Sequence, residues 1–174
     1  SADLIVANIS GKVNNAVQLR YRGQDGRMVK TLKFTLKPKQ QVLLPGQEIS
    51  EGTVGVAEVT SGNEKAIITQ SDVYYNDCQT NGIQTGYSLS GQMYKTKAIY
   101  GGFNATLGMK NLVQMINISP DKQLKLSTST SKNTAKTKKG KYRAKLVDLL
   151  AENMITTKST GKLMINGAQD NRNF

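Results

Sequence analysis

The chain of 174 residues is 37% hydrophobic and carries 24 Lys and Arg against 12 Asp and Glu, a formal charge of +12. That length suits one ordinary domain with a buried core, and that charge favours an anionic partner such as nucleic acid, a membrane surface or an acidic protein face. With no His and a single Cys, Cys78, the chain excludes imidazole acid–base chemistry, zinc sites and an intrachain disulfide.

Short strands joined by turns are predicted along the first half of the chain. In Met28–Leu36, apolar residues alternate with Lys and Thr, which is the pattern of a half-buried strand. Val17–Tyr21 alternates in the same way, and Gly23–Gly26 supplies residues that tolerate positive φ, so the two segments are predicted to pair as a hairpin. Further strands are predicted near Leu4–Val6, Val42–Leu44, Val54–Val59, Ala66–Ile68, Val73–Tyr75 and Tyr87–Leu89.

The middle of the chain is less regular. Met93–Met109 combines strand-forming residues with Gly interruptions, and Leu112–Ile118 fits either a strand or a helical turn. Leu124 and Leu126 indicate one more strand, whereas Ser127–Ser131 is low-complexity sequence that fits a linker or a polar edge. No internal repeat is evident, because the turn signals are irregularly spaced.

A change of periodicity predicts one amphipathic helix near the end of the sequence, over residues 140–153. Four apolar residues follow the spacing i, i+4, i+7 and i+8, which places them on one helix face, with Asp148 and Glu152 on the polar side. This face is the predicted oligomer interface, formed by Tyr142, Leu146, Leu149 and Leu150. Beyond the helix, Leu163–Ile165 is predicted as a last short strand or docking segment.

These elements together predict a mainly β fold. Scarce large aromatic residues and many Gly, Asn, Ser and Thr favour an antiparallel β-sandwich or barrel-like domain with a thin core, followed by one C-terminal amphipathic α-helix. The predicted division is a β-rich domain over residues 1–126, a Ser/Thr/Lys-rich linker over 127–140, and a C-terminal helix and tail over 141–174.

A basic run is the strongest functional signal in the sequence. Residues 132–145 contain no acidic residue, and residues 132–174 hold 10 basic and 3 acidic side chains. Lys and Arg neutralise phosphates without reading bases, while single-strand binding needs stacking aromatics, and only Tyr142 lies in the run. The run is predicted to contact either a nucleic-acid backbone or an acidic protein surface, or to act as a solvated arm. Its residues are Lys132, Lys136, Lys138, Lys139, Lys141, Arg143 and Lys145.

Two further patterns allow a functional and a structural interpretation. Five tyrosines lie near Lys95 and Lys97 and suit either base stacking or sheet packing and an oligomer interface: Tyr74, Tyr75, Tyr87, Tyr94 and Tyr100. Ser-x-x-Lys, the spacing of a nucleophile and its base, occurs at Ser129 and at Ser159, in Ser/Thr/Lys-rich sequence where chance produces that spacing readily.

The remaining reactive residues point to no site. The acidic residues between Glu48 and Asp77 match no metal-loop spacing and are interpreted as surface acids on turns. Cys78 has no cationic neighbour in sequence to lower its pKa and is left as an unassigned free thiol. No metal, cofactor or small-molecule substrate is predicted.

The N-terminal sequence, which opens at Ser1, has no basic leader or long apolar core, and no run of about 18 apolar residues follows. The expectation is a soluble protein without a membrane partner, made in the cytoplasm, with Ser1 exposed by removal of an initiator Met.

The first 45 residues resemble the β-rich starts of small tailed-bacteriophage virion proteins. The segments that carry the likeness are Val6–Gly11, Val17–Tyr21, Gly26–Arg27, Leu36–Pro38 and Val42–Pro45. The chain departs from the commonest pattern at Lys39, where Gly usually follows Pro. The resemblance implies a sandwich that sits on a capsid, neck or tail, and it implies no catalytic residue.

The sequence therefore predicts a non-enzymatic structural subunit of a virus particle: a phage capsid, decoration, neck or tail component located in the virion and made in the host cytoplasm. Its predicted partners are copies of itself and other virion proteins, with assembly through sheet edges and the C-terminal helix. The alternative is a nucleic-acid-binding protein that uses its basic C-terminal segment.

Overall fold

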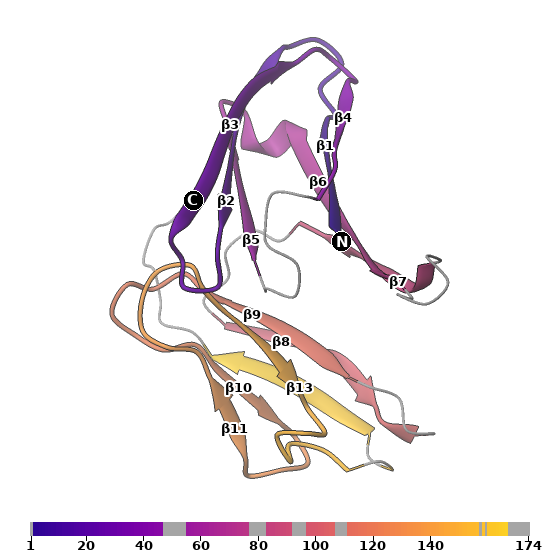
Figure 1. Ribbon diagram of the computed structural model, residues 1–174, viewed down its shortest axis with the longest axis vertical. Coiled ribbons are helices and arrows are strands. Elements are labelled where there is room, and N and C mark those ends of the chain that lie inside the picture. The colour runs from indigo at the N-terminus through magenta and orange to yellow at the C-terminus, as the bar shows by residue number, and fades with distance from the viewer. Residues whose placement is uncertain are drawn as a thin grey trace. The chain divides into compact units, whose positions relative to one another are not determined.

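The computed structural model describes residues 2–46, 55–76, 83–91, 97–106, 111–156, 158 and 160–166, and in these ranges the chain is mainly β with antiparallel sheets (Figure 1). The chain divides into two compact units. Unit 1 comprises residues 1–22 and 28–93, and unit 2 comprises residues 23–27 and 94–174.

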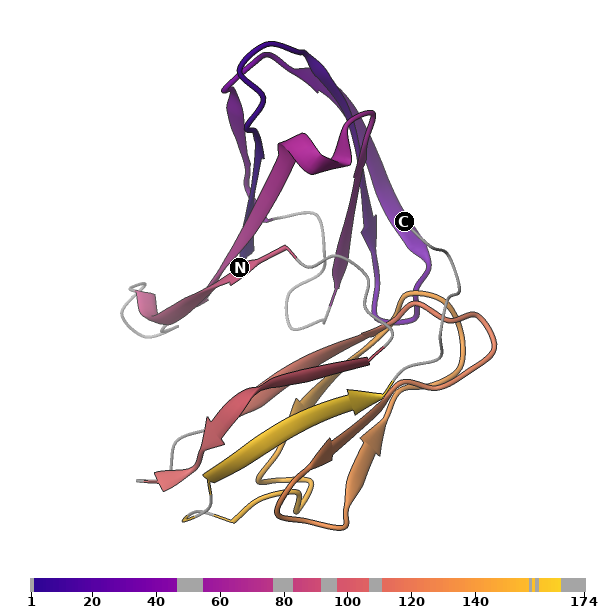
Figure 2. The same ribbon diagram turned by 180° about the vertical axis from the view of Figure 1, so that it is seen from behind.

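Unit 1 contains two sheets with a core between them. The first has the order β4-β1-β6-β7, and the second has the order β3-β2-β5 (Figures 1 and 2). Leu4 and Val6 of the first sheet and Val17 and Leu19 of the second are buried in one cluster. The strands are β1 (Ala2–Asn8), β2 (Asn15–Arg22), β3 (Met28–Leu36), β4 (Gln41–Leu44), β5 (Val56–Ser61), β6 (Ile67–Asn76) and β7 (Ile83–Ser90), and a short 3-10 helix, η1 (Glu64–Ala66), precedes β6.

The predicted hairpin is confirmed. β2 and β3 pair antiparallel with Val17 opposite Phe34 and Leu19 opposite Leu32, so the apolar positions of both strands face the same core. The turn contains Gly26 with φ of +81°, the left-handed conformation that Gly adopts without strain.

Unit 2 also contains two sheets. β11-β10-β13-β8 forms one, and β12 pairs with β9 in the other. Met115 and Val147 from the pair pack with Leu126 and Ala135 in one buried cluster. The strands are β8 (Lys97–Asn104), β9 (Leu112–Asn117), β10 (Lys125–Thr128), β11 (Thr134–Lys136), β12 (Arg143–Asp148) and β13 (Thr160–Asn166).

The two units repeat one pairing scheme, which the sequence analysis did not detect. In unit 1, β1 pairs with β4, while β2 pairs with β3 and β5. In unit 2, β9 pairs with β12, while β10 pairs with β11 and β13. The last residue of β1 and of β9 begins the same tripeptide, Asn8-Ile9-Ser10 in one unit and Asn117-Ile118-Ser119 in the other.

The predicted C-terminal amphipathic helix over residues 140–153 is wrong. Residues 143–148 form β12, whose backbone pairs with β9; Val147 is buried in the unit 2 core and its neighbour Leu146 is exposed. Only one helical turn follows, in which the Asp148 carboxylate accepts hydrogen bonds from the backbone N–H groups of Leu150 and Ala151. The i, i+4 spacing was misleading because Leu149 and Leu150 lie in that turn and not on the strand.

The division into units also differs from the predicted domains. Unit 2 takes in strands that were assigned to the β-rich domain over residues 1–126, and the predicted linker over 127–140 includes the end of β10 and all of β11. Its Ser and Thr residues are used in the fold: the Thr128 hydroxyl, for example, is buried and donates to the Met154 carbonyl at 2.9 Å.

Candidate functional site

A buried asparagine organises the lysine-bearing end of unit 2. Asn117 ends β9 with 1% of its surface exposed. Its Nδ2 donates to the carbonyls of Lys122 (2.7 Å) and Lys138 (3.3 Å), and its Oδ1 accepts from the Ser119 backbone N–H (3.1 Å). These bonds tie the turn after β9 to the loop between β11 and β12, because one side-chain amide serves both segments.

Four exposed lysines project from these two segments. We call Lys122, Lys138, Lys139 and Lys141 the unit 2 lysine cluster. The ammonium of Lys141 lies 5.2 Å from the ring centre of Tyr142, a cation–π contact. An ammonium group is a point charge with no fork geometry, so such a cluster suits phosphate contacts that read no base sequence.

One carboxylate lies among these lysines. The pKa of Asp121 is lowered from 3.8, first by the hydrogen bond from the Ser119 hydroxyl (2.8 Å) and then by its own backbone N–H, with smaller contributions from the charges of Lys122 and Lys139. The side chain is therefore an anion at neutral pH and offsets part of the positive charge there.

The structure separates the seven cations of the predicted basic run. Lys136 ends β11 opposite Lys125 and adjoins the unit 2 lysine cluster, whereas Lys132 lies in the turn at the other end of β11. Lys145 forms an ion pair with Glu152 at 2.8 Å, and Arg143 is half-buried beside Gly140. Lys138, Lys139 and Lys141 belong to the segment that Asn117 ties to the turn with Lys122. Sequence reasoning missed Lys122 because it lies outside the run.

The predicted oligomer-interface residues do not share a face. Leu149 is fully buried in the unit 2 core, Leu150 packs against that core, and Tyr142 is buried with φ of +61°. Leu146 alone is exposed, on the outer side of β12 and opposite Gln114 of β9.

An apolar patch covers the outer face of a sheet in unit 1. Because Leu4 and Val6 face the core, Ile5 and Ala7 face outward, with Leu43 of β4 opposite Ile5 and Ile68 of β6 opposite Ala7. Leu43 is 59% exposed and Ile68 is 55% exposed. We call Ile5, Ala7, Leu43 and Ile68 the apolar sheet face.

Among the described residues that lie opposite the apolar sheet face, or one row further towards Ala2, there is no Lys or Arg. Gln41 lies opposite Ala7, Gln70 lies opposite Ile5, and the next row holds Asp3 opposite Asp72. A contiguous apolar surface with a polar rim is typical of a protein–protein interaction site. In unit 2, Leu146 takes the place that Leu43 has in unit 1. Leu43 lies three residues after Gln40, which faces Asn8. Leu146 likewise lies three residues after Arg143, which faces Asn117.

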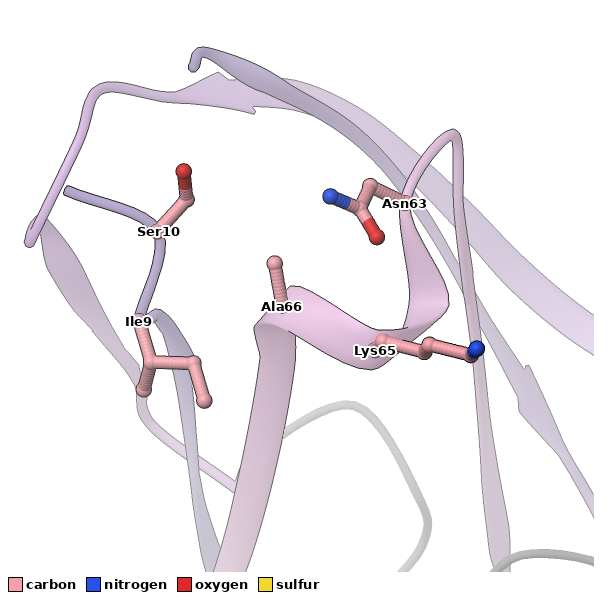
Figure 3. A pocket seen from close by; sticks show the side chains of 5 residues that line it. All are labelled: Ile9, Ser10, Asn63, Lys65 and Ala66. Atoms are coloured by element: carbon pink, nitrogen blue, oxygen red, sulfur yellow. The ribbon is translucent and has the colours of Figure 1, made fainter. Parts of the chain in front are cut away.

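A small open cavity of about 260 Å³ lies at the Asn8 end of unit 1. Ile9, Ser10, Asn63, Lys65 and Ala66 line it, and Figure 3 shows the Asn63 amide pointing into the space while the Lys65 side chain extends away from it. With one amide, one hydroxyl and no converging charge, this cavity supports no chemistry by itself.

The other sequence candidates are not assembled into a site. The predicted tyrosines divide between the units, with Tyr74, Tyr75 and Tyr87 in unit 1 and Tyr100 in unit 2, while Tyr94 lies outside the described residues. Ser129 and Lys132 are both exposed on the turn after β10, and Ser159 and Cys78 lie outside the described residues.

The acidic residues between Glu48 and Asp77 include one that is not a surface acid. Glu58 on β5 is buried and accepts from Arg22 at 2.9 Å, with Arg20 at 3.5 Å. In the described part of the chain, no three His, Cys, Asp or Glu side chains gather as metal ligands would.

A search for membrane-spanning helices and comparisons with known proteins give no further indication of function. Across the ranges that the structure describes, no helix has both the length and the apolar character needed to cross a bilayer. Comparison with protein-family models, curated proteins and solved structures gives no match to this chain.

Proposed function

We propose that this protein is a non-enzymatic structural subunit that assembles with copies of itself through the apolar sheet face of unit 1. The observation that carries the proposal is the exposure of Leu43 and Ile68 on one side of a regular sheet. Burying a Leu or Ile side chain fully contributes about 1.5–3 kcal/mol, so two such faces in contact supply a substantial share of a stable dimer interface.

Charge favours a second copy as the partner on this face. The chain carries +12, and most surfaces of two copies would repel each other. The described residues that lie opposite the apolar sheet face or in the next row are Asp3, Gln41, Gln70 and Asp72, and none of them is positively charged. Two copies related by a twofold axis would therefore bring apolar side chains together without bringing Lys or Arg side chains together.

The proposed setting is a virus particle, as a phage capsid, decoration, neck or tail component. The resemblance of the first 45 residues to tailed-bacteriophage virion proteins supports this setting, and so does a chain without His that is built from two units of antiparallel sheet, each of which we infer to be a sandwich. Isolation of intact particles tests it: the chain co-purifies with them if the setting is right, and remains in the free protein fraction if it is wrong.

Sedimentation velocity on variants tests the assembly surface. The double variant Leu43→Lys with Ile68→Lys is expected to sediment as a single chain at concentrations where the unmodified protein forms larger species. Val29→Lys is the matched control, because Val29 is 56% exposed on β3 of the other sheet of the same unit. An unmodified protein that stays monomeric, or equal sedimentation of both variants, contradicts the proposal.

A second candidate function is contact with nucleic acid through the unit 2 lysine cluster. The observation that favours it is that Asn117 holds both lysine-bearing segments in place, so four exposed ammonium groups occur at one end of the unit. Binding to a labelled DNA duplex is expected to weaken steeply with added salt. No measurable binding at about 20 mM salt removes this candidate.

A further inference from the structure

We infer that the Asn8 end of unit 1 is a second contact surface for the phosphate backbone of a nucleic acid, formed by Lys12, Lys37, Lys39 and Lys65. The inference rests on the second candidate function proposed above, and it adds a site that the basic run of the sequence does not contain.

The first argument is that the Asn8 end is built in the same way as the Asn117 end. The Asn8 Nδ2 donates to the carbonyls of Val13 (2.9 Å), Leu36 (3.1 Å) and Lys37 (3.1 Å). Its Oδ1 accepts from the Ser10 backbone N–H (3.0 Å). In unit 1, the Asn8 amide thus ties the turn after β1 to the loop between β3 and β4. In unit 2, the Asn117 amide ties the turn after β9 to the loop between β11 and β12 in the same way.

The strand registers make this correspondence specific. Asn15 lies opposite Leu36, and Val17 lies opposite Phe34. In unit 2, Leu126 lies opposite Ala135, so Leu124 faces Thr137, and their backbones are bonded at 3.0 Å. Asn15 and Leu124 both follow the buried Asn by seven positions, so Leu36 corresponds to Thr137.

Lys37 therefore corresponds to Lys138. The backbone carbonyl of Lys37 accepts a hydrogen bond from Asn8, and that of Lys138 accepts one from Asn117. Equivalent backbone bonds thus hold a lysine at the same place in both units.

The second argument is that the lysines of this end are exposed and held by its backbone bonds. Lys39 has φ of +60°, and its backbone N–H donates to the Ser10 carbonyl at 3.0 Å. Its Cε lies 4.0 Å from the position of a Cβ on Gly11, so the side chain runs beside the turn after β1. Lys65 lies on η1, whose Ala66 carbonyl accepts from the Ile9 N–H at 2.8 Å. We call Lys12, Lys37, Lys39 and Lys65 the unit 1 lysine cluster.

The third argument is the sequence around these lysines. Residues 8–13, 36–41 and 62–66 contain four lysines, no arginine, no aromatic residue and one acid, Glu64. Lysine ammonium groups with no aromatic ring to stack on a base and no arginine to form paired hydrogen bonds suit the regularly spaced phosphates of a nucleic acid. A nucleic acid presents the same phosphate pattern to both clusters, whereas a folded acidic protein would have to present two equivalent surfaces.

The experiment measures how strongly the affinity for a labelled 30-base-pair DNA duplex depends on salt. Three quadruple Lys→Gln variants of the full chain are compared. The first changes Lys12, Lys37, Lys39 and Lys65; the second changes Lys122, Lys138, Lys139 and Lys141. The control changes four exposed lysines outside both clusters: Lys30, Lys33, Lys132 and Lys158.

Each cluster variant is expected to lower the slope of log affinity against log salt by about 0.9 per lost phosphate contact, a total of about 2–4, and the control by less than about 1. Lys→Arg at the unit 1 positions is expected to retain most of the slope. Circular dichroism and urea unfolding establish that each variant keeps its fold.

Four results would overturn the inference. A slope that falls only in the unit 2 variant refutes the unit 1 surface and leaves the second candidate function standing, whereas an absence of DNA binding removes both. Polyglutamate that competes with DNA at equal charge concentration indicates an acidic protein partner, and it overturns the assignment to nucleic acid. If the slope of the control variant falls as far as the slopes of the cluster variants, DNA binding depends only on the net charge of the chain and not on either cluster.

Discussion

At the scale of single residues, two buried asparagines hold the segments that carry the two lysine clusters. Asn8 and Asn117 are each about 1% exposed, and each satisfies backbone groups on two segments that are far apart in the sequence. A Lys-rich loop has little apolar surface with which to hold its conformation, so these bonds supply the order that hydrophobic packing cannot.

Replacing either asparagine by Ala is expected to lower the free energy of unfolding by about 1–3 kcal/mol, because buried carbonyls lose their donor. Asn14→Ala is the control: Asn14 is exposed in the turn before β2, and a change within about 0.5 kcal/mol is expected. Urea unfolding measures all three variants. Equal stability of Asn117→Ala and Asn14→Ala would contradict the role assigned to the buried amides.

Asp121 gives a pH-dependent prediction at the same scale. Its pKa in the folded chain lies below 3.8, so the folded state binds the proton less tightly than the unfolded state does. Any stabilisation from this carboxylate is therefore complete above about pH 5 and is lost as pH falls through its folded pKa. An NMR titration is expected to place the Asp121 pKa below 3.8 and to raise it in Ser119→Ala, and an unchanged value in that variant contradicts the assignment.

At the scale of elements, the strands were largely predictable from the sequence, whereas the predicted C-terminal helix was wrong. Alternation in Val17–Tyr21 and Met28–Leu36 predicted a hairpin because a strand that is buried on one face must alternate. Alternation does not identify Ala144–Val147 as a strand, because the segment is short and its buried residues lie three positions apart. The apolar residues of the following turn extended that pattern into an apparent helical period. Pairing with β9 satisfies the backbone of β12 without a helix.

A pair of charge substitutions distinguishes strand from helix. Val147 is fully buried and Leu146 is 38% exposed, whereas a helix with Leu146 on its apolar face would leave Val147 outside it. Val147→Asp is expected to destabilise the chain by at least about 3 kcal/mol, and Leu146→Asp by less than about 1 kcal/mol. Thermal unfolding measures both. The reverse order would restore the helical interpretation.

At the scale of the whole molecule, neither the repeat of the pairing scheme nor the candidate surfaces could be fully predicted from the sequence. The repeat of the pairing scheme is carried by hydrogen-bonded registers and by one shared tripeptide, while the core positions are filled by different residues, Val6 in one unit and Met115 in the other. Burial constrains side-chain size and polarity more than identity, so the repeat leaves little trace in the sequence.

The candidate surfaces show the same limit. The basic run was visible because its charges are consecutive, but Lys122 and the unit 1 lysine cluster gather from separated turns. The apolar sheet face was invisible because alternating apolar residues on both sides of β1 and β4 do not reveal which side is covered. The candidate surfaces of this chain are therefore formed by residues that strand pairing and side-chain hydrogen bonds bring together from distant parts of the sequence.

The most direct measurement of the proposed assembly is photo-crosslinking from position 43. A photoreactive phenylalanine analogue replaces Leu43, and the linked peptides are identified by mass spectrometry after irradiation. The expected product has twice the mass of the chain, with the link to a second copy within residues 3–9, 41–43 or 68–70. A product that remains at the mass of one chain at every concentration tested would contradict self-assembly through the apolar sheet face.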